Sequence, residues 1–263
     1  MDPRHNQLLA ALPDDEWARW LPLLEPAVLR YGQVLFESGD TPSSVLFPTT
    51  AVISLSYMTR DGASAEFAVV GNEGLVGISL FMGGNTMPSR ALVQSAGQGW
   101  RLPASTARAA VERGGSALHL VLRYTQSLIV QTAQTAACNR HHSIDQQFSR
   151  RLLMGLDRAQ GDELAMTHEA VANLLGVRRE GVTAAAKKLQ QAGVIRYHRG
   201  HIEVLDRPRL EQQACECYAV AKREHQRLLP RPLRALPPLS LSQALRMAMP
   251  NQASERRSMA LAA

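Results

Sequence analysis

Residues 167–189 read THEAVANLLGVRREGVTAAAKKL, and this stretch predicts two short helices joined by a tight turn. Thr167 is a good N-cap, because its side-chain oxygen can accept a hydrogen bond from a free N–H of the first turn. Gly176 directly follows Leu174 and Leu175, and a glycine after an apolar periodic run marks a helix end that permits positive φ. The stretch therefore predicts a helix-turn-helix.

The second helix, beginning near Arg178, is predicted to have one apolar side and one charged side. Arg179 can donate two hydrogen bonds to guanine, and Glu180 can accept one from the cytosine amino group. Both fall in the first turn, the part of a recognition helix that meets base edges in a major groove. The inner side is formed by residues at helical spacing, namely Val182, Ala185, Ala186 and Leu189.

Residues 191–205 alternate around Arg199 and Gly200 and predict a β-hairpin, which would complete a winged helix-turn-helix. The alternative interpretation is a pair of surface helices with solvated charges, which would show the same apolar pattern. The turn glycine, the Arg-Arg-Glu cluster and the hairpin together favour binding of double-stranded DNA. The predicted DNA contacts are Thr167, His168, Arg178, Arg179, Glu180, Thr183, Lys187, Lys188, Arg199 and His201.

Length and charge agree with a two-domain DNA-binding chain. The 263 residues are too many for one winged helix-turn-helix and carry a net charge of +6. Lys and Arg number 10 against 11 Asp and Glu in residues 1–140, but 14 against 11 in residues 141–230. Residues 230–263, rich in proline at the start and basic throughout, predict a flexible tail that attracts phosphates without sequence preference.

The sequence predicts a cytoplasmic protein with no membrane partner. No apolar run follows Met1, so no signal peptide is expected, and no apolar stretch approaches transmembrane length. The three cysteines are an odd number and do not suggest a disulfide framework.

Residues 27–103 consist of short β-rich segments punctuated by glycines about every ten residues. This spacing predicts an antiparallel β-barrel or jelly roll, interrupted by a helical turn near residues 75–81. Residues 6–29 predict short helices that Trp17, Trp20 and Leu24 hold against this domain.

A long helix is predicted after Gly114 and Gly115. Its apolar and small side chains recur at spacings of four and three, a heptad-like seam that favours a homodimer of paired helices. An ordinary core helix of a monomer is the alternative, but two recognition helices need a two-fold partner to read half-sites about 34 Å apart. The predicted dimer interface is Leu118, Leu122, Thr125, Ile129, Thr132 and Ala136.

These segments together resemble the Crp/Fnr family of bacterial transcription regulators. The resemblance rests on Arg179-Glu180 in residues 167–189, and on the barrel turns with the segment GNEGLVGISLF at residues 71–81. It implies an α+β chain with a cyclic-nucleotide-binding-like β domain (1–115), a dimerisation helix (116–142) and a winged helix-turn-helix domain (143–229), followed by the tail (230–263). It also implies RNA polymerase and a small-molecule effector as partners. One further base-contacting arginine of the family corresponds to Ala184 here, so the operator sequence is expected to differ.

The effector pocket implied by the resemblance departs from cyclic-AMP-binding members. Ile78 stands where those members have a glutamate for the ribose, and Ser89-Arg90 replaces their Arg-Ser pair. On a strand, a one-residue displacement turns the arginine to the opposite face, although a loop shift would restore it; otherwise Arg90 is a solvated surface charge. We therefore expect an unidentified effector other than cyclic AMP. The pocket residues expected are Gly71, Gly77, Ser79, Ser89 and Arg90.

Three other functions are alternatives to this one. A regulator with a degenerate sensor domain would keep the DNA chemistry and need no effector. A cyclic-nucleotide-binding regulatory protein would need the missing ribose and phosphate ligands. No nucleophile elbow, phosphate loop or zinc-protease motif is present, so no enzyme is predicted.

No metal site and no cofactor are predicted. An iron–sulfur cluster needs about four thiolates, and the chain has Cys138, Cys215 and Cys217 alone. A single helix is predicted over residues 209–229, packed on the DNA-binding domain. Positions i and i+2 of a helix lie about 200° apart, so Cys215 and Cys217 could not share an ion there. His141 and His142 are predicted to be solvated at a polar hinge.

Overall fold

The computed structural model describes residues 1–159 and 161–229, so the predicted tail over residues 230–263 lies outside the described residues. The N-terminal part begins with two short helices, continues with seven strands and ends with a third helix. Their bounds are α1 Gln7–Ala10, α2 Asp14–Trp20, β1 Glu25–Leu29, β2 Val34–Phe36, β3 Ser44–Pro48, β4 Val52–Met58, β5 Ser64–Val70, β6 Arg90–Ser95, β7 Gly97–Pro103 and α3 Ala104–Arg113.

The seven strands form two antiparallel sheets, in the orders β1-β7-β3 and β2-β6-β4-β5. Alternate residues of both sheets, such as Leu29, Leu46 and Ile53, bury their side chains in one shared cluster. Of the two predicted alternatives, a barrel and a jelly roll, the structure has the second, as two packed sheets of a jelly-roll type. The predicted helical turn is present as a 3₁₀ helix over Ile78–Phe81.

The N-terminal helices close one end of this β domain, as predicted. Trp20 is buried, and its ring lies 6.1 Å from the ring of Phe47 and 6.2 Å from that of Phe81, centroid to centroid. Large aromatic side chains contribute strongly to a core because each removes a large apolar area from water.

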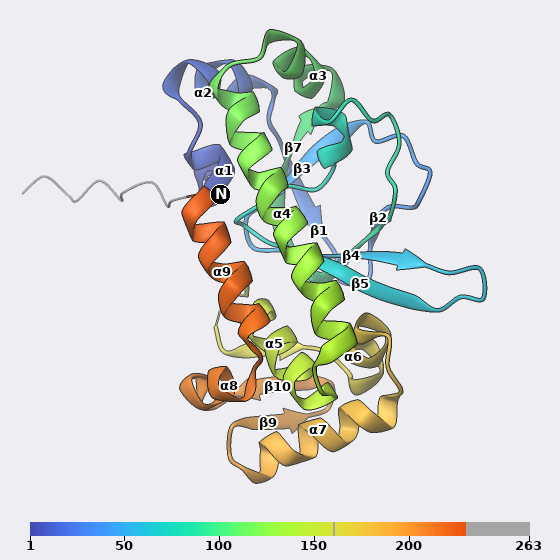
Figure 1. Cartoon of the computed structure of the whole chain (residues 1–263). Coiled ribbons are helices and arrows are strands. Elements are labelled where there is room, and N and C mark those ends of the chain that lie inside the picture. Colours follow the sequence, from blue (N-terminus) through green and yellow to red (C-terminus); the bar gives the residue numbers. More distant parts are fainter. Residues whose placement is uncertain (160, 230–263) are drawn as a thin grey trace, which may run out of the picture. The chain divides into compact units, whose positions relative to one another are not determined.

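The long helix α4 spans Ser116–His141, close to the predicted range. The C-terminal part of the described chain follows α4 (Figure 1). It contains a small three-stranded sheet with the order β8-β10-β9. Its elements are α5 Ile144–Leu156, β8 Glu163–Ala165, α6 His168–Leu175, α7 Arg179–Gln191, β9 Ile195–His198, β10 His201–Val204, α8 Arg207–Gln213 and α9 Glu216–Leu228. None of the described helices is both long and apolar enough to cross a membrane.

The predicted single helix over residues 209–229 is wrong. Ala214 and Cys215 have extended backbones, with ψ of 158° and 165°, and they separate α8 from α9. Beyond this break α9 runs beside α4 (Figure 1), and Leu228 joins the apolar cluster of the β domain. The helix therefore packs along α4, and not only on the DNA-binding part as predicted.

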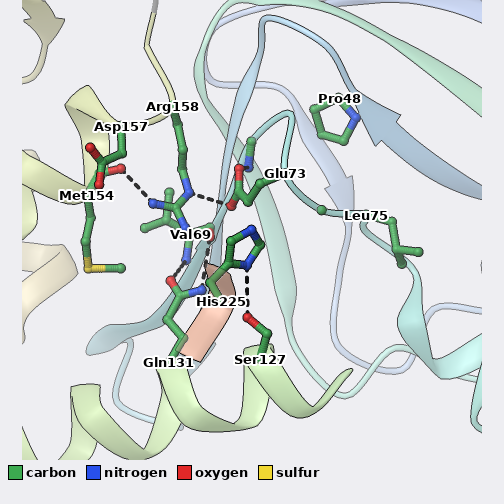
Figure 2. A network of polar contacts seen from close by, with 12 residues as sticks. Pro48, Val69, Glu73, Leu75, Ser127, Gln131, Met154, Asp157, Arg158 and His225 are labelled. Atoms are coloured by element: carbon green, nitrogen blue, oxygen red, sulfur yellow. Dashed lines mark hydrogen bonds and ion pairs between the residues drawn. The ribbon is translucent and has the colours of Figure 1, made fainter. Parts of the chain in front are cut away.

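Ion pairs connect the β domain to α5. Arg158, just after α5, lies 2.7 Å from Glu73, and Gln131 of α4 bonds the backbone of Val69 (Figure 2). Arg151 and Glu66 form a second pair at 2.6 Å with both side chains buried. A buried ion pair is costly to break, because the charge that remains has no partner and no water.

We expect Glu66→Gln to lower the free energy of unfolding by about 3 kcal/mol or more, because Arg151 would stay buried without its carboxylate. Glu203→Gln is the matched control, since Glu203 pairs with Arg196 at an exposed site and should cost under about 1 kcal/mol. Urea unfolding of both variants measures the difference. Equal losses would show that the buried Arg151–Glu66 pair contributes no more to the free energy of unfolding than an exposed pair does.

Candidate nucleic-acid interface

The first helix and the turn form as the sequence predicted. The Thr167 hydroxyl accepts a hydrogen bond from the Ala170 N–H at 3.1 Å and caps α6. Gly176 ends α6 with φ of 66°, in the left-handed region that glycine adopts without steric cost.

The recognition helix α7 buries one face and exposes the other. Val182, Ala185, Ala186 and Leu189 belong to the same apolar cluster as Phe148 and Leu152 of α5. Gly181 lets the two helices approach closely, since a Cβ there would lie 2.7 Å from Cδ1 of Ile144. The opposite face carries exposed polar side chains, among them Arg179, Glu180, Thr183 and Lys187.

His168 at the start of α6 is positioned by two neighbours. Its ring stacks on Tyr197 with centroids 4.1 Å apart, and its Nδ1 is hydrogen-bonded to Thr183 Oγ1 at 3.2 Å. Burial, and then the charge of Arg179, lower the pKa of His168 from its usual 6.5. The lowered pKa favours the neutral ring, which offers a phosphate no positive charge. No local sequence signal marks Tyr197, because only the folded hairpin brings it to α6.

The wing is the predicted hairpin of β9 and β10. Arg199 and Gly200 form its two-residue turn with φ of 45° and 85°, and both left-handed residues are typical of such a turn. The third strand, β8, was not predicted. It places Glu163 2.6 Å from Nδ1 of His201.

Not every predicted contact residue is free to meet DNA in the same way. Arg178 and Arg199 are exposed, as is Thr167. Lys188 lies on the flank of α7 that faces α5, where its Nζ is 2.6 Å from the Asp145 carboxylate. A phosphate contact by Lys188 would compete with that ion pair.

None of the five predicted effector-pocket residues is among the described residues that line the pocket bounded by Glu25 and Arg101. Arg90 is half-buried, and its Nε lies 3.3 Å from the carboxylate of Glu37, so its charge is paired at a partly exposed site. Ser89 is buried, and Gly77 has φ of 103° before the 3₁₀ turn. The pocket at Glu25 and Arg101 has a volume of about 450 Å³ and is lined, among the described residues, by Glu25, Leu35, Phe36, Ser43, Ser44, Leu46, Arg101 and Pro103.

The predicted dimer residues differ in exposure along α4. Leu122 and Ile129 are 48% and 60% exposed, and Ala136 is exposed as well. Leu118 and Thr132 are half-buried. Thr125 is 8% exposed and donates a hydrogen bond to the Val121 carbonyl, so its own chain covers it, contrary to its predicted place in the seam.

The cysteines and His142 lie together, against expectation. The break at Ala214 leaves Cys215 outside α9, so the argument that kept Cys215 and Cys217 apart does not apply. Cys138, Cys215 and Cys217 are buried in a cluster of their own. His142 is half-buried beside them, not solvated.

Comparison with known proteins gives a family for the DNA-binding part. Residues 148–213 match the model of the Crp-like helix-turn-helix domain. No curated protein matches the chain.

Solved structures share the fold at low identity. A protein from Eubacterium rectale described as a transcriptional regulator of the Crp/Fnr family is 18% identical (80% of this chain, 98% of that one, TM-score 0.63). FixK2 from Bradyrhizobium japonicum is 15% identical (73% and 98%, TM-score 0.63). The c-di-GMP responsive global regulator CLP from Xanthomonas campestris is 16% identical (73% and 99%, TM-score 0.56).

The domain match covers the helices α6 and α7 with their turn, and the fold likeness extends over the β domain and α4. Residues 148–213 thus form a Crp-like helix-turn-helix domain, and the chain shares its fold with solved structures of Crp/Fnr regulators.

Proposed function

We propose that the chain acts as a homodimer that reads a two-fold symmetric operator through α7 of each protomer. The observation that carries this proposal is the exposed first turn of α7, where Arg179 and Glu180 project away from the apolar cluster. Buried Val182 and Leu189 fix which face of the helix is presented. Side chains on that face can enter a major groove without disturbing the core.

Different residues would take different parts in DNA binding. Arg179 reads guanine O6 and N7, and Glu180 accepts from the cytosine amino group. Phosphates are held by the hydroxyl of Thr167 and by the cations Arg178, Lys187 and Arg199, which fix the register without reading sequence. His168, whose lowered pKa favours the neutral ring, orients Thr183.

The dimer is supported by the free apolar stripe on α4. Leu122 and Ile129 are seven residues apart, so their side chains lie one above the other on the helix. Two exposed large apolar side chains in line favour a second copy of the same helix, because self-pairing removes both from water. A two-fold axis between two paired copies of α4 would also place the two recognition helices side by side.

The proposed effector is a small molecule other than cyclic AMP. Ile78 packs against the apolar cluster of the β domain and offers a ribose no carboxylate. Arg90 is paired with Glu37, so a cyclic phosphate would have to compete with that carboxylate. The pocket of about 450 Å³ offers Glu25 and Arg101 as polar groups. The Xanthomonas regulator is described as responsive to c-di-GMP, which favours varied effectors on this fold.

We expect Arg179→Ala to weaken operator binding by about 1–3 kcal/mol and to leave binding to random DNA nearly unchanged, because the lost contacts are to bases. Lys187→Ala should weaken binding to the operator and to random DNA equally, since it removes a phosphate contact. Arg108→Ala, an exposed arginine of α3, is the matched control. Gel-shift titrations on an operator selected from random sequence measure all three. An Arg179→Ala loss of equal size on random DNA would refute base reading.

Replacing Ile129 by glutamate should raise the dimer dissociation constant about 100-fold or more, because two carboxylates facing each other across the axis cost several kcal/mol. Sedimentation equilibrium measures the constant. Val28→Glu, which changes an exposed apolar side chain of β1, should leave the dimer intact. A dimer unaffected by Ile129→Glu would place the interface elsewhere.

Calorimetric titration with cyclic AMP should give no saturable heat, because Ile78 cannot hydrogen-bond the ribose and Arg90 is paired with Glu37. Repeating operator binding with a small-molecule cell extract should change the affinity if an effector exists. Saturable cyclic AMP binding would overturn the proposed exclusion. Tight operator binding that no extract alters would favour the effector-independent regulator.

A further inference from the structure

Four side chains with metal-binding atoms meet where the end of α4 faces the start of α9. Cys138, His142, Cys215 and Cys217 place one sulfur or ring nitrogen each so that all four atoms lie within 4.8 Å of one another. The Sγ atoms of Cys138 and Cys215 are 3.4 Å apart, and Cys217 Sγ is 3.6 Å from Nδ1 of His142. In a tetrahedral zinc site, with Zn–S about 2.3 Å and Zn–N about 2.0 Å, neighbouring ligand atoms lie about 3.6–3.8 Å apart.

The local backbone explains how four ligands from two segments converge. Cys138 and His142 are four residues apart, so the last turn of α4 puts both on one face. Cys215 is the extended N-cap of α9, and Cys217 lies in its first turn. Because Cys215 has an extended backbone, the two cysteines are not separated by the helical rotation of 100° per residue, and both side chains can point the same way.

The surroundings of His142 are those of a metal ligand. Its Nδ1 faces the sulfurs, while its Nε2 lies 3.3 Å from the Glu216 carboxylate. Metal-bound histidines almost always donate their second ring N–H to a carboxylate, a carbonyl or water, which fixes the tautomer and the ring orientation. The backbone carbonyl of His142 also accepts a hydrogen bond from Gln147 at 2.9 Å.

A buried arginine supplies a charge that the site would balance. Arg150 is 3% exposed and donates to the Thr135 hydroxyl at 2.8 Å. Its Nε has no hydrogen-bond partner among the described residues, and none of the ion pairs found in that part of the chain involves it. One divalent ion with three thiolates and a neutral imidazole carries a net charge of −1, opposite to that of Arg150.

We propose that Cys138, His142, Cys215 and Cys217 bind one Zn²⁺ ion in a closed tetrahedral site that fixes the start of α9 to the end of α4. Three thiolates and one imidazole suit zinc by softness and geometry. Binding releases three thiol protons to solvent and oxidises nothing. With no ligand position left open the site is structural, and it sits directly before Ser143, where α4 joins the DNA-binding part.

The test measures zinc and free thiols in the full chain, purified under reducing conditions without chelator. We expect one zinc per chain by atomic emission, and three thiols that react with a thiol reagent only after a chelator is added. Cobalt exchanged into the protein should show the visible absorption of tetrahedral thiolate coordination. Protein with free thiols that binds neither zinc nor cobalt would overturn the site, and so would a Cys138–Cys215 disulfide found by mass spectrometry.

Paired histidine variants separate ligation from general damage. His142→Ala should lower zinc affinity at least about tenfold, because one of four ligands is lost, while His141→Ala, its exposed neighbour, should keep full affinity. His142→Cys should restore zinc binding by supplying a fourth thiolate. Circular dichroism checks that each variant is folded. Equal zinc affinity in His142→Ala and His141→Ala would exclude His142 as a ligand.

Discussion

The burial of one face of α7 against α5 and α6 determines which side chains the helix presents to solvent. Val182, Ala186 and Leu189 are held in a cluster with Phe148, and helical periodicity then forces Arg179 and the other polar side chains of the opposite face outward. Rotating α7 to hide its polar face would expose these apolar groups to water. The presentation of the DNA-reading side chains is thus a consequence of core packing.

The end of α4 is where several roles meet. Its exposed stripe is the proposed dimer contact, its last turn carries Cys138 and His142, and Ser143 opens α5 with a capping box. The ion pairs of α5 with Glu66 and Glu73 tie the DNA-binding part to the β domain. A ligand in the β domain could bias the recognition helices only by binding one arrangement of these contacts better than another.

Local signals were predictable from the sequence, and long-range ones were not. The Thr167 cap, the Gly176 turn and the Arg199-Gly200 hairpin follow from chemistry within a few residues, and the structure has each where it was predicted. Strand β8 forms only because β10 is there to pair with it. No glycine or proline lies at the helix break at Ala214, so the sequence does not predict the break. The cysteine cluster depends on this break and is therefore not predictable from the sequence either. From the sequence, Lys188 is predicted to contact DNA, because its ion-pair partner Asp145 is distant in sequence.

The central claim is that two copies of α7 read base edges in the major groove, and methylation interference on the selected operator tests it most directly. Dimethyl sulfate modifies guanine N7 in the major groove and adenine N3 in the minor groove. The account predicts interference at guanines in two clusters related by two-fold symmetry and centred about 10 base pairs apart. Interference confined to adenines, or to one unpaired cluster, would contradict it.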